Sequence, residues 1–300
     1  MKSKLNVRIL TLFILGFAYS YAQQQPYNLF YRYTLNSLNP AVAGAHKAWE
    51  VATDFRFQWQ GVEDAPRYQT FLLSAPVGKR IGLGLSAIND KVFVEQQTTM
   101  YVDVSYALPI SVDATLFLGI KAGGRIYSLD ASRIDVPQPS DPYLQSISGE
   151  FRPNVGVGMY LTHKDFYISL SAPRLLDSKK SDLVEGRATT VADRIHVYLS
   201  GGYDVDISSD LTLRPSIMLR NVEGADLLLD VTAALRYMGN FEAGLVYRSS
   251  NSFGALILAQ VFDGIRLGYG YENALQRNLL VATRGSHEFL LLLEVDKLLR

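Results

Sequence analysis

The sequence predicts an all-β protein, a transmembrane antiparallel up-and-down β-barrel of about 14 strands (roughly 12–14), with short periplasmic turns and longer outer loops. Two observations lead to this prediction. Apolar and polar residues alternate with a period of two along most of the chain, and the gaps between the alternating segments are short and long in turn. Outer-membrane barrels combine both features, because their outward side chains face lipid and both chain ends lie in the periplasm.

The clearest alternating segment covers residues 49–60. Every second residue of this segment forms its apolar side, which we call the apolar parity: Trp49, Val51, Thr53, Phe55, Phe57 and Trp59. This side begins and ends with tryptophan. A tilted membrane-spanning strand needs roughly 9–11 residues, with aromatic side chains near both lipid interfaces. We therefore expect this segment to be the first strand, with its apolar side facing lipid.

Similar segments follow to the end of the chain. We expect the later strands at residues 68–75, 81–89, 100–108, 116–126, 155–161, 166–170, 195–203, 211–219, 227–237, 241–248, 253–261, 265–272 and 287–295. Pro153 and Pro215 lie in or beside these strands, although each proline removes one backbone hydrogen-bond donor. A bulge or a strand start at these positions would accommodate them.

The gaps between the segments predict which mouth of the barrel each connection occupies. Counted from the first strand, the even gaps are all short, and the long gaps are all odd: residues 90–99, 127–150, 173–194 and 273–285. With both chain ends in the periplasm, the odd gaps are outer loops. The gaps 127–150 and 173–194 allow two interpretations, either exposed loops without a partner or a contact surface for an exported protein.

The N-terminus resembles a processing signal. Basic residues precede an apolar run at 9–18, and small side chains follow at Ser20 and Ala22. This order predicts a signal peptide over residues 1–22, since the run is too short for a membrane anchor. Residues 23–47 lack alternation and form an irregular leader, which we expect either to plug the barrel or to lie in the periplasm. Residues 48–300 then form the barrel in the outer membrane of a Gram-negative cell.

Composition excludes several classes of function. The 300 residues include no cysteine, which rules out disulfides, cysteine nucleophiles and cysteine metal sites. The formal net charge is +0, so the chain has no basic excess that would favour nucleic acid as a partner. Outer-membrane lipid is the partner that the apolar parity predicts.

Motifs that could carry chemistry are weak. The Gly-x-Gly pairs at 82/84, 156/158 and 268/270 lie inside alternating strands, so we interpret them as small inward residues rather than a phosphate site. His196, Ser200 and Asp204 share a parity and could suggest a barrel hydrolase. Residues four apart on a strand are about 13 Å apart, which is too far for a catalytic triad. We predict no catalytic residues, no metal and no cofactor.

Charged side chains occur on the inward parity of several strands. They are Lys121, Arg125, Arg214, Arg220, Asp230, Arg236, Glu242, Arg248, Arg266 and Glu272. The simpler interpretation is a hydrated lumen in which opposite charges pair across strands. The alternative is a cationic conduit or a seat for the leader. We favour the first interpretation.

Short motifs in a fixed order resemble a known family. They are residues 38–44 (Leu-Asn-Pro-Ala-Val-Ala-Gly), 58–62 (Gln-Trp-Gln-Gly-Val), 65–70, 82–90, 118–123, 153–160, 268–271 and 285–288. Together they resemble the PorP/SprF outer-membrane proteins of the type IX secretion system over nearly the whole mature chain. The C-terminus departs from the pattern of many family members, which end on an aromatic residue. Here Lys297 to Arg300 follow the last strand instead.

The resemblance implies a non-enzymatic outer-membrane protein of the Bacteroidota. Such proteins assist the export or surface display of cargo, including adhesins used in gliding motility, and work with other type IX components. Family-motif positions are candidates for partner contacts or for plugging the barrel: Asn39, Pro40, Gly44, Gln58, Trp59, Gly61 and Pro66. The competing functions are a passive diffusion porin and, less favoured, the barrel hydrolase.

Overall fold

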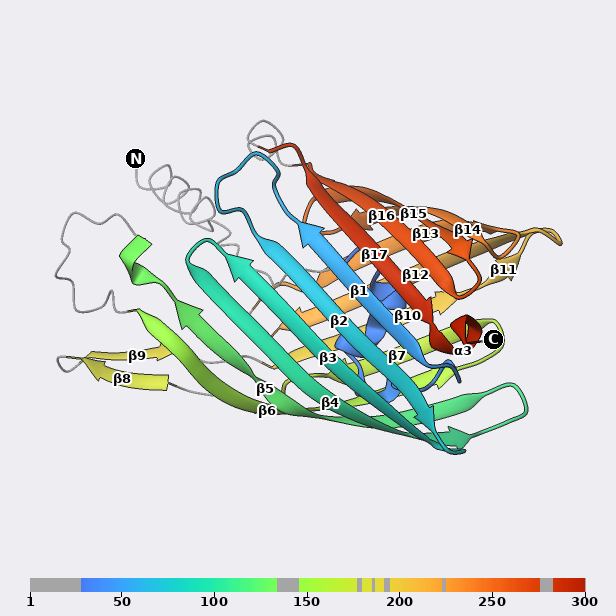
Figure 1. Ribbon diagram of the computed structural model, residues 1–300, viewed down its shortest axis with the longest axis horizontal. Coiled ribbons are helices and arrows are strands. Elements are labelled where there is room, and N and C mark those ends of the chain that lie inside the picture. Colours follow the sequence, from blue (N-terminus) through green and yellow to red (C-terminus); the bar gives the residue numbers. More distant parts are fainter. Residues whose placement is uncertain are drawn as a thin grey trace, which may run out of the picture.

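A closed antiparallel barrel forms the body of the molecule (Figure 1). The computed structural model describes residues 28–133, 146–176, 180–184, 187–191, 195–222, 225–275 and 283–299, and the proposed signal peptide, residues 1–22, lies outside them. In these residues one sheet has 15 strands, and because the short β11 continues β10, they fill fourteen positions around the barrel. The predicted fold class and strand number are therefore confirmed.

The strands follow one another around the barrel in chain order. They are β1 (Glu50–Phe57), β2 (Arg67–Val77), β3 (Ile81–Val92), β4 (Glu95–Pro109), β5 (Thr115–Leu129), β6 (Ile147–Thr162), β7 (Phe166–Ala172), β10 (His196–Tyr203), β11 (Val205–Asp206), β12 (Leu211–Val222), β13 (Leu228–Tyr237), β14 (Phe241–Arg248), β15 (Ser252–Phe262), β16 (Ile265–Ala274) and β17 (Ser286–Glu294). The barrel closes where β1 pairs with β17. A separate hairpin, β8 (Lys180–Val184) and β9 (Arg187–Val191), lies between β7 and β10 in the chain.

The first strand shows why this sequence forms a membrane wall. Phe55 is exposed on the outside of β1, whereas Asp54 and Arg56 are buried toward the lumen. The same alternation continues on the neighbouring strands, where Leu83 and Leu85 of β3 point outward. Lipid stabilises the outward apolar parity and the lumen accommodates the polar one, so the predicted orientation of the 49–60 segment is correct.

The connections differ between the two mouths of the barrel. We call the mouth where β1 begins and β17 ends the inner mouth, and the opposite one the outer mouth. The inner connections are short: residues 78–80, 110–114, 163–165, 207–210, 238–240 and 263–264. The outer mouth has the longer ones, at residues 58–66, 130–146, 173–195 and 275–285. This asymmetry is the predicted one.

The predicted outer loop at residues 90–99 is wrong. Strands β3 and β4 continue through it, and only residues 93–94 connect them. Asn89 pairs with Thr98 across these strands, and Gln96 and Thr98 both donate hydrogen bonds to its side chain. These strand ends carry polar residues on both faces, so no lipid-facing alternation revealed them in the sequence.

Three other expectations need adjustment. Strands β5 and β6 extend into the predicted loop 127–150, which shortens it to residues 130–146. The expected gap at 173–194 contains the β8–β9 hairpin. Pro153 and Pro215 lie within strands β6 and β12, opposite Gly124 and Ala233 respectively, rather than at strand starts.

The lumen is occupied by residues 28–46, which we call the luminal segment (Figure 1). It contains three short 3₁₀ turns, η1 (Tyr31–Tyr33), η2 (Leu35–Ser37) and η3 (Pro40–Val42). The segment begins near the outer half of β17, where Leu29 donates to Glu288, and it ends at the inner mouth, where Gly44 donates to Ser74 of β2. The chain then turns into β1.

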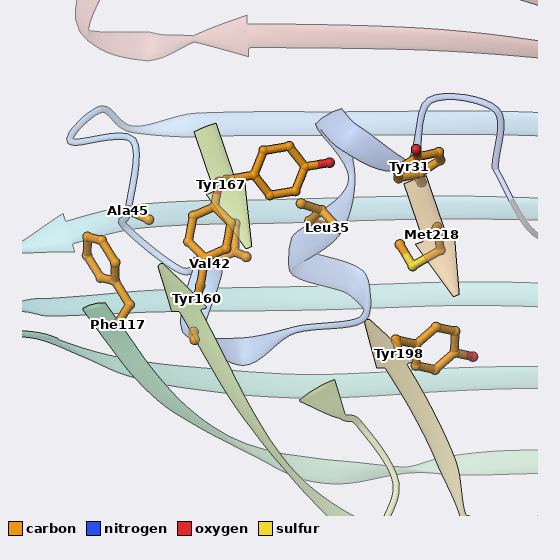
Figure 2. Packing of buried hydrophobic residues seen from close by; sticks show 10 residues of the cluster. Tyr31, Leu35, Val42, Ala45, Phe117, Tyr160, Tyr167, Tyr198 and Met218 are labelled. Atoms are coloured by element: carbon orange, nitrogen blue, oxygen red, sulfur yellow. The ribbon is translucent and has the colours of Figure 1, made fainter. Parts of the chain in front are cut away.

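Two apolar clusters hold the luminal segment against the wall. The larger contains Tyr31, Leu35, Ala41, Val42, Ala45, Phe117, Tyr160, Tyr167, Tyr198 and Met218 (Figure 2). The smaller packs Leu29 and Phe30 against Val246, Leu256, Leu258 and Leu290. Burying a large apolar side chain contributes about 1.5–3 kcal/mol, so these contacts together stabilise the segment inside the barrel.

The C-terminus closes the inner end of the β1–β17 seam. Helix α3 (Val295–Leu298) follows β17 directly. Val295 donates to the carbonyl of Trp49, and the Trp49 amide donates to the Asp296 carboxylate at 2.9 Å. The residues after the last strand therefore join the strand ends. Across the described ranges, no helix has the length and apolarity to cross a membrane.

Candidate functional site

Glycines on the inner wall make room for the luminal segment. A Cβ atom at Gly82 would lie 1.9 Å from the Ala43 carbonyl oxygen, and one at Gly119 would lie 2.2 Å from the Ala41 nitrogen. Gly268 and Gly270 face Phe30 and Leu29 in the same way. Real Cβ atoms do not come this close to other heavy atoms, so at these positions the wall can lie so near the segment only because it carries no side chain. The Gly-x-Gly pairs are thus inward small residues, as predicted.

Asn39 fixes the middle of the luminal segment. Its side-chain nitrogen donates to the Met159 carbonyl at 2.9 Å and to the Ser169 hydroxyl at 2.8 Å. Its side-chain oxygen accepts from the Ala41 amide and caps η3, whose first residue is Pro40. Asn39 is fully buried and sits against Gly158. A single amide side chain therefore connects η3 to strands β6 and β7.

A buried ion network holds the start of the segment. The Glu288 carboxylate accepts from the Leu29 and Phe30 amides at 2.9 and 3.1 Å, and from Arg56 at 2.8 Å. Arg56 also contacts Glu272 at 2.7 Å. A buried carboxylate is stable only with such partners, so the network ties the segment to β1, β16 and β17. Glu288 and Arg56 lie on the polar side of their strands but are not among the inward charges expected from the sequence.

Lys121 makes a second polar contact with the segment. Its ammonium group lies 3.3 Å from Asp103 on β4 and donates to the carbonyls of Asn36 and Ser37 at 3.2 and 3.0 Å. Lys121 and Asp103 are both buried. This lysine therefore binds the end of η2 as well as balancing a wall carboxylate.

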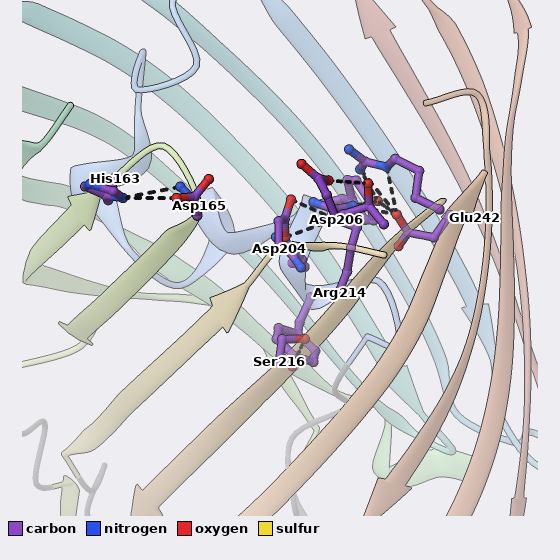
Figure 3. Close-up of polar contacts among 12 residues, drawn as sticks. His163, Asp165, Asp204, Asp206, Arg214, Ser216 and Glu242 are labelled. Carbon is purple, nitrogen blue, oxygen red and sulfur yellow. Dashed lines mark hydrogen bonds and ion pairs between the residues drawn. The ribbon is translucent and has the colours of Figure 1, made fainter. Parts of the chain in front are cut away.

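A third polar cluster surrounds Tyr33 nearer the inner mouth. The Tyr33 hydroxyl donates to Glu242 at 2.7 Å and accepts from Arg214 at 2.7 Å. Figure 3 shows Arg214 between Asp204 and Glu242. Burial raises the pKa of the Tyr33 hydroxyl, which keeps it protonated as a donor. Arg32 of the segment forms an ion pair with Asp204.

The inward charges fit neither interpretation alone. They pair across strands, as the simpler interpretation expects, but residues 28–46 rather than water fill this part of the lumen, so the wall is also the seat for the leader that the alternative named. Arg248 pairs with Glu272 at 2.9 Å, and Arg236 pairs with Glu242 at 3.2 Å, so opposite charges do meet across strands. Lys121 and Arg214 also contact the luminal segment, which gives these pairs a second role. The inner wall is both a charge-paired surface and a seat for residues 28–46.

The candidate motif positions separate into two groups. Asn39, Pro40 and Gly44 lie in the lumen, and the φ of +67° at Gly44 favours glycine. The others, Gln58, Trp59, Gly61 and Pro66, lie in the outer connection after β1. There the Gln58 amide donates to the Pro66 carbonyl, and Gly61 has φ +95°.

The outer connection at residues 58–66 contacts its neighbours. The Gln60 amide donates to Gly285, and the Phe93 amide donates to the Asp64 carbonyl. Asp64 also forms an ion pair with Arg133. Three other outer connections therefore meet this one, which gives the outer mouth a defined surface.

The residues of the conceivable hydrolase do not assemble. Asp204 pairs with Arg32 and Arg214 beyond the end of β10, whereas His196 lies at its start beside Tyr198. In the part of the chain that the structure describes, no group of three His, Asp or Glu side chains could hold a metal ion.

A closed, lipid-facing barrel with a filled lumen is the architecture of an integral outer-membrane protein. Comparison with protein families agrees with it: residues 20–293 match the family described as type IX secretion system membrane protein PorP/SprF. The chain belongs to this family. It is therefore an outer-membrane component of the type IX secretion system.

Solved structures of similar proteins are distant. The outer membrane protein Omp33 of Acinetobacter baumannii has 8% identity and a TM-score of 0.49, covering 82% of this chain and 97% of that one. A FadL homologue of Pseudomonas aeruginosa has 11% identity and a TM-score of 0.46, covering 85% of this chain and 91% of that one. The monoaromatic hydrocarbon channel CymD has 11% identity and a TM-score of 0.48, covering 85% and 90%. A search of curated proteins finds no match.

Proposed function

We propose that this protein is a non-enzymatic accessory barrel that assists the export or surface display of a cargo protein, such as an adhesin that serves gliding motility. In this role the barrel wall anchors the protein in lipid and the outer connections contact the cargo or another secretion component. Membership of the PorP/SprF family supports the secretion role. The finer assignment to cargo display is our proposal.

The observation that carries the proposal is the filled lumen. The luminal segment is held by two apolar clusters and by the contacts of Asn39, Lys121 and Glu288. Small solutes diffuse through porins because an aqueous path crosses the barrel. A barrel whose interior is packed with its own chain leaves its outer surfaces, rather than a channel, for contact with other molecules. The larger connections lie at the outer mouth.

The competing functions have less support. A passive porin would need the luminal segment to leave the barrel, although the wall glycines fit it closely. A hydrolase would need His196 beside a nucleophile and a carboxylate, and Asp204 is committed to arginines instead. We therefore favour an accessory role without catalysis.

The loop between β5 and β6 provides the test. Residues 134–145 lie outside the described residues, and their removal leaves the paired ends of β5 and β6 in place. We expect this deletion to reduce surface display of cargo, measured by antibody labelling of intact cells. As a matched control, the inner turn 110–114 is replaced by a Gly-Ser pair, which should leave display unchanged.

Two results would argue against the proposal. Normal display after deletion of residues 134–145 would remove the loop from the mechanism. Normal display of every surface protein in cells that lack the whole protein would reject the accessory role itself. Barrel folding in both variants is checked by the shift in gel mobility between heated and unheated samples.

A further inference from the structure

A cavity opens between the luminal segment and the wall at the inner mouth. Its volume is about 360 Å³, and its lining includes Tyr33 from the segment, Glu50 from β1 and Glu294 from β17. A second cavity on the outer side of the segment measures only about 60 Å³ and shares no lining residue with the first. The outer cavity has room for only a few water molecules, so of these two cavities only the one that opens inward has room for a larger ligand.

Arginines form part of the lining of the inner-mouth cavity. Four arginines line it: Arg32, Arg214, Arg236 and Arg266. The acids Asp204 and Glu242, which pair with the first three of these arginines, do not belong to the lining. The lining acids are Glu50, in contact with His46, and Glu294, in contact with Arg266 and Lys297. The lining therefore carries two more arginines than carboxylates.

Arg32 supplies a second indication of a ligand. Its guanidinium lies over the Tyr167 ring, 5.3 Å from the ring centre, and pairs with Asp204 through one nitrogen. The other terminal nitrogen, Nη1, is buried and has no hydrogen-bond partner. A buried guanidinium donor without an acceptor is costly, and an anionic oxygen would satisfy it.

Another part of the lining is apolar. Leu35 and Val42 of the luminal segment face the cavity together with Leu72 of β2 and Leu292 of β17. A small hydrophilic anion such as phosphate would gain nothing from these leucine and valine side chains. A carboxylate attached to a short apolar group would use both kinds of lining residue, with the charge at the arginines and the apolar part against the leucines.

We propose that the inner-mouth cavity binds a carboxylate with a short apolar substituent, entering from the periplasm. Such a group occurs at the C-terminus of a polypeptide and in small organic acids, and the arginines would recognise it in the same way in both. Guanidinium groups bind carboxylates through two parallel hydrogen bonds, which gives the site its preference for this anion. Such binding does not depend on the cargo role proposed above.

Calorimetry on the purified full-length protein in nanodiscs tests this binding. The probes are pentanoate, pentylamine and N-acetyl-Leu-Ala-Leu with either a free carboxylate or a terminal amide. We expect pentanoate or the free-acid peptide to bind, and pentylamine and the amide not to bind. Binding of the peptide alone would indicate a polypeptide terminus, and binding of pentanoate alone a small acid.

Variants separate this site from unspecific attraction. Arg236→Gln and Arg266→Gln each remove a lining charge from a partly exposed side chain, and each should weaken binding at least tenfold. Leu292→Trp should also abolish binding by filling the cavity. Arg80→Gln is the matched control, because Arg80 lies at the inner turn 78–80 outside the lining.

The proposal is overturned if neither carboxylate binds the wild-type protein. It is also overturned if Arg80→Gln weakens binding as much as the two lining variants, since the attraction would then come from the surface. Unchanged binding in Leu292→Trp would place the ligand elsewhere and would count equally against it.

Discussion

Single side chains connect the luminal segment to the barrel. Asn39 joins η3 to strands β6 and β7, and Glu288 holds the start of the luminal segment by accepting from the Leu29 and Phe30 amides. Both residues are completely buried. Because a buried polar group without its partner is costly, each residue also favours one position of the segment over others.

Replacing Asn39 with alanine should loosen the luminal segment without opening the barrel. Asn39→Ala removes the cap of η3 and three hydrogen bonds to the wall, and leaves the Met159 and Leu170 carbonyls and Ser169 without this donor. The loss should destabilise the segment by about 1–3 kcal/mol. Hydrogen exchange should accelerate in residues 35–45 and remain slow in β1 and β17. Asn240→Ala, in the inner turn after β13, is the control and should leave exchange unchanged.

At the scale of elements, the sequence predicted the barrel strands better than the luminal segment that they enclose. Lipid imposes a period of two on each strand, so the segment 49–60 could be recognised without knowing what it contacts. The strand ends at Asn89 and Thr98 are polar on both faces and escaped detection. The luminal segment has no period at all, because its short 3₁₀ turns pack on several strands at once.

The inward-facing glycines were the one sequence feature that bore on what fills the lumen. Gly82, Gly158 and Gly268 could be assigned to the inward face from their parity. Their sequence positions could not tell whether water or protein fills the space that they leave. Only the structure shows that Ala43, Asn39 and Phe30 occupy it.

Adding one methyl group to this face should therefore displace η3. In Gly119→Ala the new Cβ would lie 2.2 Å from the Ala41 nitrogen, which neither backbone can accommodate without moving. We expect a loss of about 1–3 kcal/mol in stability, measured by denaturant unfolding in detergent. Gly201→Ala is the matched control, because its Cβ would meet only the Tyr167 carbonyl oxygen at 3.4 Å. Equal stability of the two variants would contradict this close fit.

At the scale of the whole molecule, the barrel surrounds its own N-terminal segment. The chain runs through the lumen from the outer half to the inner mouth and only then enters β1, and the β1–β17 seam closes the wall around it. The alternation of short and long gaps between the strands in the sequence predicted the closed wall. The sequence left the place of the leader open, since the same residues could have formed a periplasmic segment.

A filled lumen predicts low conductance, which separates an accessory barrel from a diffusion porin. We expect the wild-type protein in planar lipid bilayers to show no large, steady, ungated current. Deletion of residues 28–45 should produce such a current, because it removes the apolar clusters and the contacts with Glu288 and Lys121 that fill the barrel. The heat-dependent gel shift verifies that the shortened barrel still folds. A large steady current through the wild-type protein, unchanged by the deletion, would show that the segment does not block the lumen and would favour a porin.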